Sequence, residues 1–204
     1  MKQAKIKLSK TIIIKTTLEL INEKQGSSFV TIREIAKKLN CSHPNIYNYY
    51  NSVDMLLWDC LENVMLKMID TVLISTSIVQ ISDKLKTFFE KLLDFYLNNK
   101  GWYNLIWFDH IKGQMPDNIK KIINKPRQEF CIFLQEIYPN YNLTPIAENI
   151  TDTIHSYIHG QVSRIISGRI FIQDQNAIKK HIILTSIELV DLYIKAKGIK
   201  NEKD

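Results

Sequence analysis

The stretch FVTIREIAKKLNCSHPNIYNYYNSVDMLL, residues 29–57, decides the fold of this chain. Thr31 precedes a helical apolar pattern, and Glu34 follows it three residues later, which predicts a capping box at a helix start. Asn40 predicts the end of that helix, because asparagine tolerates the left-handed backbone conformation of a tight helix exit. The first helix is therefore expected over residues 31–39.

A second short helix is expected over residues 43–49. Ser42 is a favoured residue for its N-terminal cap, and Pro44 is tolerated in a first turn. Ile46 and Tyr50 supply its buried side. Two short helices joined by a three-residue turn form a helix-turn-helix unit, whose second helix enters the major groove of DNA.

The outward face of this second helix has a composition that suits DNA. Asparagine can pair bidentately with adenine, and histidine can donate or accept a hydrogen bond. No acidic residue occurs between Glu34 and Asp54, whereas an ordinary solvent-exposed helix normally carries glutamate. A plain helical hairpin therefore fits less well than a DNA-reading helix with an exposed set of His43, Asn45, Tyr47, Asn48 and Tyr49.

The rest of the chain predicts an all-α protein. Strand-like alternation with hairpin dipeptides is absent, and the many isoleucines recur at helical rather than alternating spacing. Leu57, Cys60, Leu61, Val64 and Met68 show this spacing. About nine helices are expected, at 8–24, 31–39, 43–49, 53–75, 82–99, 102–112, 117–136, 145–167 and 176–197.

Positive charge is concentrated at the N-terminal end. Residues 1–58 contain nine Lys/Arg and four Asp/Glu, whereas residues 59–204 contain eighteen and seventeen. A localised basic end suits a polyanion, either DNA or an anionic membrane surface, although a solvated tail that only aids solubility remains an alternative.

On these residues the chain resembles the TetR-type (TetR/AcrR) helix-turn-helix transcriptional regulators. The matching positions are Phe29, Thr31, Ile35, Ala36, Leu39, Ser42, Tyr47 and Tyr50, with Ser52 and Leu56 at the expected spacing. The resemblance is strong over about residues 8–57. It implies a helix-turn-helix domain over residues 1–52 and a larger helical domain for ligand binding and dimerisation over residues 53–204.

Carried over by position, the resemblance implies DNA contacts from both short helices. Thr31, Arg33, Tyr47 and Tyr49 would contact the backbone, and His43, Pro44, Asn45 and Asn48 would face bases, with Ser42 beside them. Two departures occur, since Asn40 replaces the usual turn glycine and Val53 replaces a usual lysine. We hypothesise that Lys2, Lys5 and Lys7 compensate for the missing lysine.

The resemblance also implies a homodimer that binds a near-palindromic, double-stranded operator. The helices at 145–167 and 176–197 would pair with those of a partner, and the wide apolar arc of the last helix supports this independently. The expected interface residues are Ile154, Ile158, Ile165, Ile183, Ile187, Val190 and Ile194.

A small-molecule effector is implied in the same domain, which would make the protein a repressor released by an inducer. Aromatic residues crowd the middle helices, and ligand pockets are mostly apolar. An aromatic stripe at helical spacing is nevertheless usually core. The preferred pocket set is Phe88, Leu92, Tyr96, Trp107 and Tyr157, and the ligand would be apolar or aromatic. No other cofactor is expected.

Other chemistries have weaker support. His155 and His159, with Asp152 one turn earlier, have metal-ligand spacing, but no fourth ligand is evident and a structural pair is favoured. Cys41 suits a small buried residue better than a redox switch. No phosphate loop, nucleophile elbow or zinc-protease motif indicates an enzyme.

The bulk properties predict a soluble, cytoplasmic protein. The apolar runs are too short for a membrane span, and the three cysteines are an odd number without metal-like spacing. The main alternative to a regulator is a helical protein that uses its basic N-terminal end to bind an anionic membrane or a partner.

Overall fold

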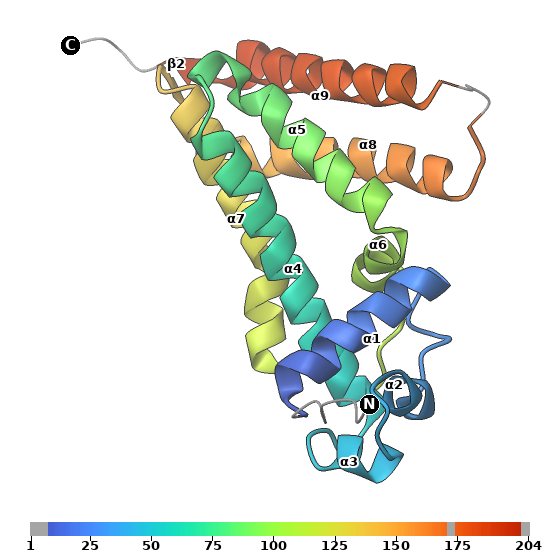
Figure 1. Ribbon diagram of the computed structural model, residues 1–204. Helices are drawn as coiled ribbons and strands as arrows, with labels where there is room; N and C mark the ends of the chain where they lie inside the picture. Colours follow the sequence, from blue (N-terminus) through green and yellow to red (C-terminus); the bar gives the residue numbers. More distant parts are fainter. Residues whose placement is uncertain (1–7, 171–173, 201–204) are drawn as a thin grey trace. The chain divides into compact units, whose positions relative to one another are not determined.

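A computed structural model describes residues 8–170 and 174–200 of the chain (Figure 1). Within this part, nine α-helices and one two-stranded ribbon form two compact units. Unit 1 contains the chain up to Lys67 together with Asn99–Ile122, and unit 2 contains Met68–Asn98 together with the chain from Ile123 onward. Lys2, Lys5 and Lys7 lie outside the described residues.

Unit 1 is built on the first three helices. They are α1 (Lys10–Lys24), α2 (Ile32–Lys38) and α3 (His43–Tyr47), followed by the first part of α4 (Val53–Ser77). α1 packs against α2, and α2 packs against α3. Their apolar faces meet in a core whose fully buried side chains include Ile13, Ile21, Ile35, Ile46, Tyr50 and Leu56.

The same unit includes α6 (Lys100–Trp107), which packs directly on α1. The backbones approach so closely at Gly101 that a Cβ atom there would overlap the carbonyl oxygen of Ile21 and lie 2.6 Å from the Cα of Asn22. Polar contacts fix the crossing: the Gly101 amide donates to Asn22 Oδ1 at 3.1 Å, and the Trp102 indole donates to the Leu18 carbonyl at 2.9 Å.

The segment after α6 is also fastened to the α1–α2 connection. The Asp109 carboxylate accepts a 2.6 Å hydrogen bond from the buried Ser27 amide. Asn104 donates to the Gln25 carbonyl at 2.7 Å. The amides of Phe108 and Asp109 both bond to the Asn104 carbonyl, which ends α6 at Trp107. The helix expected over 102–112 is therefore shorter at its C-terminal end than predicted.

Unit 2 contains α5 (Ile81–Asn98), α8 (Ala147–Ile166) and α9 (Gln175–Lys197), which pack against one another. It also contains the end of α4 and most of α7 (Asp117–Ile137). The ring of Phe88 in α5 packs against two rings of α7: it is tilted against Phe130, with centroids 4.7 Å apart, and stacked on Phe133, with centroids 5.0 Å apart.

The predicted all-α class is confirmed, and most helix bounds agree with the expectation within about two residues. One ribbon departs from it: β1 (Tyr141–Asn142) pairs antiparallel with β2 (Ile199–Lys200). Two-residue strands are too short to show an alternating pattern in the sequence. Among the described residues, no helix combines the length and apolar character needed to cross a bilayer.

The close crossing at Gly101 makes a direct prediction. Gly101→Ala should lower the free energy of unfolding by about 3 kcal/mol or more, because the added methyl group meets backbone that cannot move aside. For a chain of this size, that corresponds to a fall in Tm of about 6–12 °C, measurable by circular dichroism.

Gly160→Ala is the matched control, since a Cβ built on this glycine in α8 meets nothing within 4 Å beyond its chain neighbours and the backbone of its own helix. Alanine favours a helix interior over glycine by about 0.5–1 kcal/mol, so this variant should be unchanged or slightly more stable. Equal Tm values for wild type and Gly101→Ala would contradict the close approach of α1 and α6.

Candidate nucleic-acid interface

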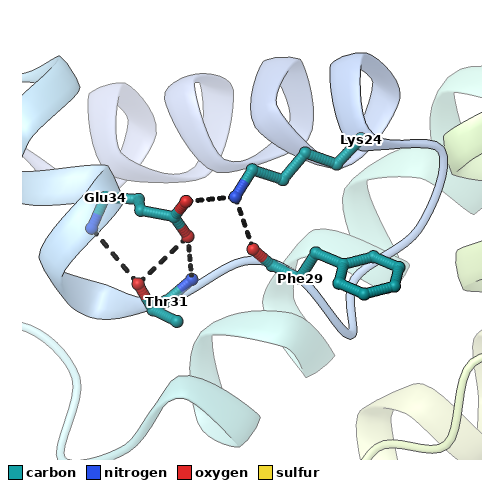
Figure 2. Close-up of polar contacts among 4 residues, drawn as sticks. All are labelled: Lys24, Phe29, Thr31 and Glu34. Carbon is teal, nitrogen blue, oxygen red and sulfur yellow. Dashed lines mark hydrogen bonds and ion pairs between the residues drawn. The ribbon is translucent and has the colours of Figure 1, made fainter.

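The start of α2 is held by the predicted capping box. The Glu34 amide donates to Thr31 Oγ1 at 3.3 Å, and the Thr31 amide donates back to Glu34 Oε2 at 3.1 Å. Lys24, from the end of α1, pairs with the other Glu34 oxygen and donates to the Phe29 carbonyl at 2.6 Å (Figure 2). The carboxylate thus joins the helix cap to the preceding helix.

The exit of α2 is the tight turn expected from Asn40. This residue is in the left-handed conformation, with φ 50°. Its amide donates to the Lys37 carbonyl at 3.1 Å, and the Cys41 amide donates to the Ala36 carbonyl at 3.0 Å. These two bonds are the Schellman pattern, which satisfies carbonyls that a helix end leaves without partners. This conformation confirms the expectation that Asn40 can take the place of the usual glycine in the turn.

Cys41 lies within this turn and is half-buried. Burial raises the pKa of its thiol, which disfavours the reactive thiolate. The side chain therefore suits the small packing residue that the sequence favoured over a redox switch.

α3 presents a polar face and buries only one side. Ile46 is fully buried and Tyr50, just beyond the helix, is 2% exposed. Ser42 occupies the N-cap position, but its side chain makes no capping bond; instead its carbonyl accepts from the Asn45 amide at 3.0 Å. The Ser42 hydroxyl is therefore not used in capping, contrary to expectation.

The nine residues predicted to contact DNA all belong to unit 1. Eight are exposed and one, Tyr49, is half-buried. They gather on α3 with its flanking residues and on the first turn of α2, so the structure brings them onto two adjacent elements. The exposed eight are Thr31, Arg33, Ser42, His43, Pro44, Asn45, Tyr47 and Asn48.

Some of the charged residues around this face form ion pairs, and others are exposed on α2. Lys38 pairs with Glu23 at 2.5 Å and with Glu19 at 3.6 Å, and the Glu23 contact raises its pKa. Lys24 pairs with Glu34, as described above. The acids of unit 1 near α2 are thus paired with these two lysines, while Arg33 and Lys37 are exposed on α2. The outward balance is positive, as a phosphate-facing surface requires.

One family model matches a short N-terminal segment of this chain. A family model described as the NUMOD1 domain matches residues 15–49, a segment that includes most of α1 together with α2 and α3. A search by sequence finds no significant match among curated proteins.

Similar solved structures cover most of the chain. A TetR-family transcriptional regulator from Streptomyces coelicolor is 15% identical with TM-score 0.72, covering 92% of this chain and 82% of its own. A Rhodococcus sp. RHA1 protein of unknown function is 10% identical with TM-score 0.76, covering 93% and 98%. A TetR variant from Acinetobacter baumannii AYE, solved in complex with minocycline, is 16% identical with TM-score 0.62, covering 93% and 98%.

The fold and the exposed α3 face define a helix-turn-helix protein with an attached helical unit. The chain has the TetR-type fold, as the sequence resemblance predicted.

The seven residues expected at a dimer interface lie on α8 and α9, but mostly face inward. Five of them, Ile154, Ile158, Ile183, Val190 and Ile194, are 0–4% exposed within the single chain. Ile165 and Ile187 are half-buried. These five residues are therefore covered by neighbours in the same chain. The helical spacing of these residues correctly predicted that they are buried. It could not indicate whether the residues that cover them belong to the same chain or to a second one.

The five residues expected in a pocket are distributed over both units. Trp107 belongs to unit 1, whereas Phe88, Leu92, Tyr96 and Tyr157 belong to unit 2. Tyr96 is buried and the other three of unit 2 are half-buried. The Tyr157 hydroxyl is buried and has no hydrogen-bond partner among the described residues.

The histidine pair on α8 is a stacked contact. The His155 and His159 rings lie 5.7 Å apart and nearly parallel, and burial lowers the pKa of both. Asp152 instead accepts a 3.0 Å bond from Arg127. The described part of the chain contains no group of three or more residues arranged to hold a metal ion.

The cap of α2 predicts a measurable pH dependence. Hydrogen bonds from Lys24 and then Thr31 hold the pKa of Glu34 below its usual 4.5. A carboxylate with a lowered pKa contributes stability above the pKa of the unfolded chain, and this contribution is lost as pH falls through the folded value. Glu34→Gln should therefore flatten the fall in unfolding free energy below about pH 4.5, in urea titrations at several pH values.

Thr31→Ala should cost about 1 kcal/mol at neutral pH, because it removes the cap oxygen. Glu62→Gln is the matched control for Glu34→Gln, since the Glu62 carboxylate accepts a hydrogen bond from Asn118 and has no role at this cap. A Glu34→Gln variant whose acid limb matches the wild-type limb would show that Lys24 and Thr31 do not stabilise the ionised carboxylate.

Proposed function

We propose that this protein is a sequence-specific DNA-binding transcription regulator, with no catalytic role, that reads DNA with α3. One observation carries the proposal. α3 and its flanks present an exposed, acid-free set of amide, imidazole and phenol groups while Ile46 and Tyr50 anchor the helix in the core. A helix held in this way can enter the major groove without unfolding its support.

The part of the DNA that each residue is expected to contact follows from the chemistry of its side chain. Asn45 and Asn48 offer the donor and acceptor pair that matches adenine, and His43 offers a single donor or acceptor. Thr31 and Arg33 lie on the first turn of α2, where they suit phosphate oxygens. In this proposal, residues 1–52 bind DNA and residues 53–204 regulate that binding.

We propose further that the protein acts as a homodimer. A two-fold pair places two α3 helices about 34 Å apart on one DNA face and requires a near-palindromic operator. The outward face of α9 supports this, because Leu184 and Leu192 lie two turns apart and are 47% and 62% exposed. These leucines replace the inward-facing isoleucines as the proposed contact.

An apolar or aromatic effector is the proposed regulator of DNA binding, which would make the protein a repressor that its inducer releases. The aromatic cluster of α5 and α7 and the buried, unpartnered Tyr157 hydroxyl support a mostly apolar site with one polar anchor. The A. baumannii neighbour, which has a similar fold, was solved in complex with minocycline, which supports a small-molecule site. Coupling of this kind is typically about 1–3 kcal/mol.

Selection of bound sequences from a random DNA pool tests the DNA-reading function. Wild type should enrich a near-palindrome. Asn45→Ala should cost about 1–3 kcal/mol on that site and relax preference at one position of each half-site, because one bidentate pair is lost. Tyr47→Phe should weaken all probes by a similar factor, measured by fluorescence anisotropy at fixed salt.

Two results would overturn this function. One is binding of all probes with equal affinity by wild type. The other is tight binding to vesicles of phosphatidylglycerol together with no preference among DNA sequences, which would favour the membrane-binding alternative. Neutral phosphatidylcholine vesicles serve as the control for the charge effect.

The dimer has its own test. Leu192→Glu should shift the sedimentation coefficient from a dimer to a monomer and weaken operator binding, because a charge would be buried at the partner face. Ile132→Glu is the matched control, since this α7 side chain is 66% exposed and lies off α8 and α9. Loss of the dimer in both variants, or in neither, would contradict the proposed face.

A further inference from the structure

The start of α1 lies directly beside the chain that follows α3 (Figure 1). The Tyr49 hydroxyl donates a 2.8 Å hydrogen bond to the carbonyl of Leu8, although the two residues are 41 positions apart. Ser9 then caps α1 by accepting a hydrogen bond from the Ile12 amide at 3.3 Å. These contacts fix the backbone on both sides of Lys10, the first residue of α1, next to the end of α3.

The side chain of Lys10 is placed by an aromatic ring. Its ammonium lies 5.0 Å from the centroid of the Tyr50 ring, within the range of a cation–π interaction. Tyr50 is buried and its hydroxyl donates to Asp59 Oδ2 at 2.8 Å, so the ring is itself held in place. A lysine side chain loses much rotamer freedom when it is ordered, and here part of that loss occurs before any ligand binds.

The charge of Lys10 is not neutralised by neighbouring acids. The residue is exposed, and within the part of the chain that the structure describes no carboxylate forms an ion pair with it. The next acid along the sequence is Glu19, which lies 3.6 Å from the Lys38 ammonium instead. The Lys10 ammonium can therefore bind an anion from outside the chain.

The position of this charge relative to α3 matches the edge of a DNA groove. α3 has five residues, so it is about 7.5 Å long, which is less than the roughly 12 Å width of the major groove. Tyr50 follows the last residue of α3, Tyr47, by three positions, a reach of at most about 11 Å. When α3 occupies the groove, a cation beside Tyr50 therefore lies close to the phosphates that border it.

We propose that Lys10 is a DNA-binding residue whose ammonium, held by the Tyr50 ring, binds a phosphate at the edge of the groove that α3 occupies. This inference rests on the proposed DNA-binding function. Lys10 is not among the nine residues predicted from the sequence to contact DNA, because only its contact with Tyr50 places it beside α3. Phosphate contacts fix the position of a protein on the duplex, so Lys10 acts on affinity and not on base preference.

Salt titrations of Lys10→Gln test the phosphate contact. The probe is the duplex enriched from the random pool, or a random-sequence duplex if none is enriched, titrated between about 50 and 200 mM salt. Loss of one contact should lower the salt slope by about 0.9 per bound protomer, so the affinity loss should be about 3.5-fold larger at the low-salt end. Lys10→Arg should retain the wild-type slope, because the guanidinium keeps the charge.

Lys15→Gln is the matched control. Lys15 is also exposed on α1, but it lies one and a half turns further along, about 140° around the helix from Lys10. This variant should keep the wild-type slope. Equal falls in slope for the two glutamine variants would overturn the proposal, because they indicate a general effect of net charge. A wild-type slope for Lys10→Gln would overturn it as well.

The role of the ring is tested by two substitutions of Tyr50. Tyr50→Phe keeps the ring and Tyr50→Leu removes it, while both lose the bond to Asp59. Lys10→Gln should lower the slope as much in the phenylalanine background as in wild type, and by less in the leucine background. An equal loss in all three backgrounds contradicts positioning by the ring.

A measurement without DNA keeps this point decidable where Tyr50→Leu does not fold. The ε-methylene protons of Lys10 should be shifted upfield by the ring current of residue 50, both in wild type and in Tyr50→Phe. Random-coil chemical shifts for these protons, measured by NMR, would show that the ring does not hold the side chain.

The same titrations separate this inference from the proposed function. Equal affinity of wild type for every duplex contradicts sequence-specific reading, and in that case a lower slope for Lys10→Gln still supports the phosphate contact. Base preference at the Asn45 position, together with a wild-type slope for Lys10→Gln, overturns only the inference. Failure of wild type to bind any duplex overturns both.

Discussion

The α3 surface that is proposed to face DNA depends on how both ends of α2 are fixed. At the start, Glu34 is shared between the Thr31 cap and Lys24 of α1. At the end, Asn40 turns the chain through the left-handed region, with two backbone bonds that close the helix. Because α2 spans only Ile32–Lys38, it is too short to be stable by itself and needs these contacts. The direction of α3 follows from where α2 ends.

Polar groups in this unit are used mainly to position backbone. Trp102, Asn104, Asp109 and Tyr49 each bond to a main-chain amide or carbonyl of another segment. A backbone group cannot move without moving its helix, so such bonds define angles between helices more strictly than contacts between flexible side-chain ends. Such precision would suit the proposed function, because base edges in a DNA groove have a fixed spacing.

Local signals account for what the sequence predicted well. The capping box, the asparagine turn and the helical spacing of isoleucines all act over three to seven residues, and each is confirmed in α2, its exit or the helix bounds. The predicted DNA-contacting residues are accessible for the same reason, since buried Ile46 dictates which side of α3 faces outward.

Contacts between distant segments left no such signal. Nothing near Gly101 in the sequence indicates that Ile21 lies against it, and nothing near Tyr49 indicates Leu8. The isoleucines of α8 and α9 show the same limit, because an apolar stripe reveals burial but not whether the cover is the same chain or another. Ser42 is a smaller example of this limit, since a serine at an N-cap position need not use its hydroxyl to cap the helix.

The packing of α6 on α1 also determines when, during translation, the N-terminal helices acquire all their contacts. Unit 1 is discontinuous: its N-terminal part ends at Lys67, and the piece that packs on α1 begins at Asn99. During synthesis, the three N-terminal helices are translated before α6. Some thirty residues of the other unit are translated in between. Leu18 and Asn22 can therefore form their contacts with Trp102 and Gly101 only afterwards. The helix-turn-helix segment therefore acquires its complete support only after α6, which ends at Trp107 of the 204 residues, has been translated.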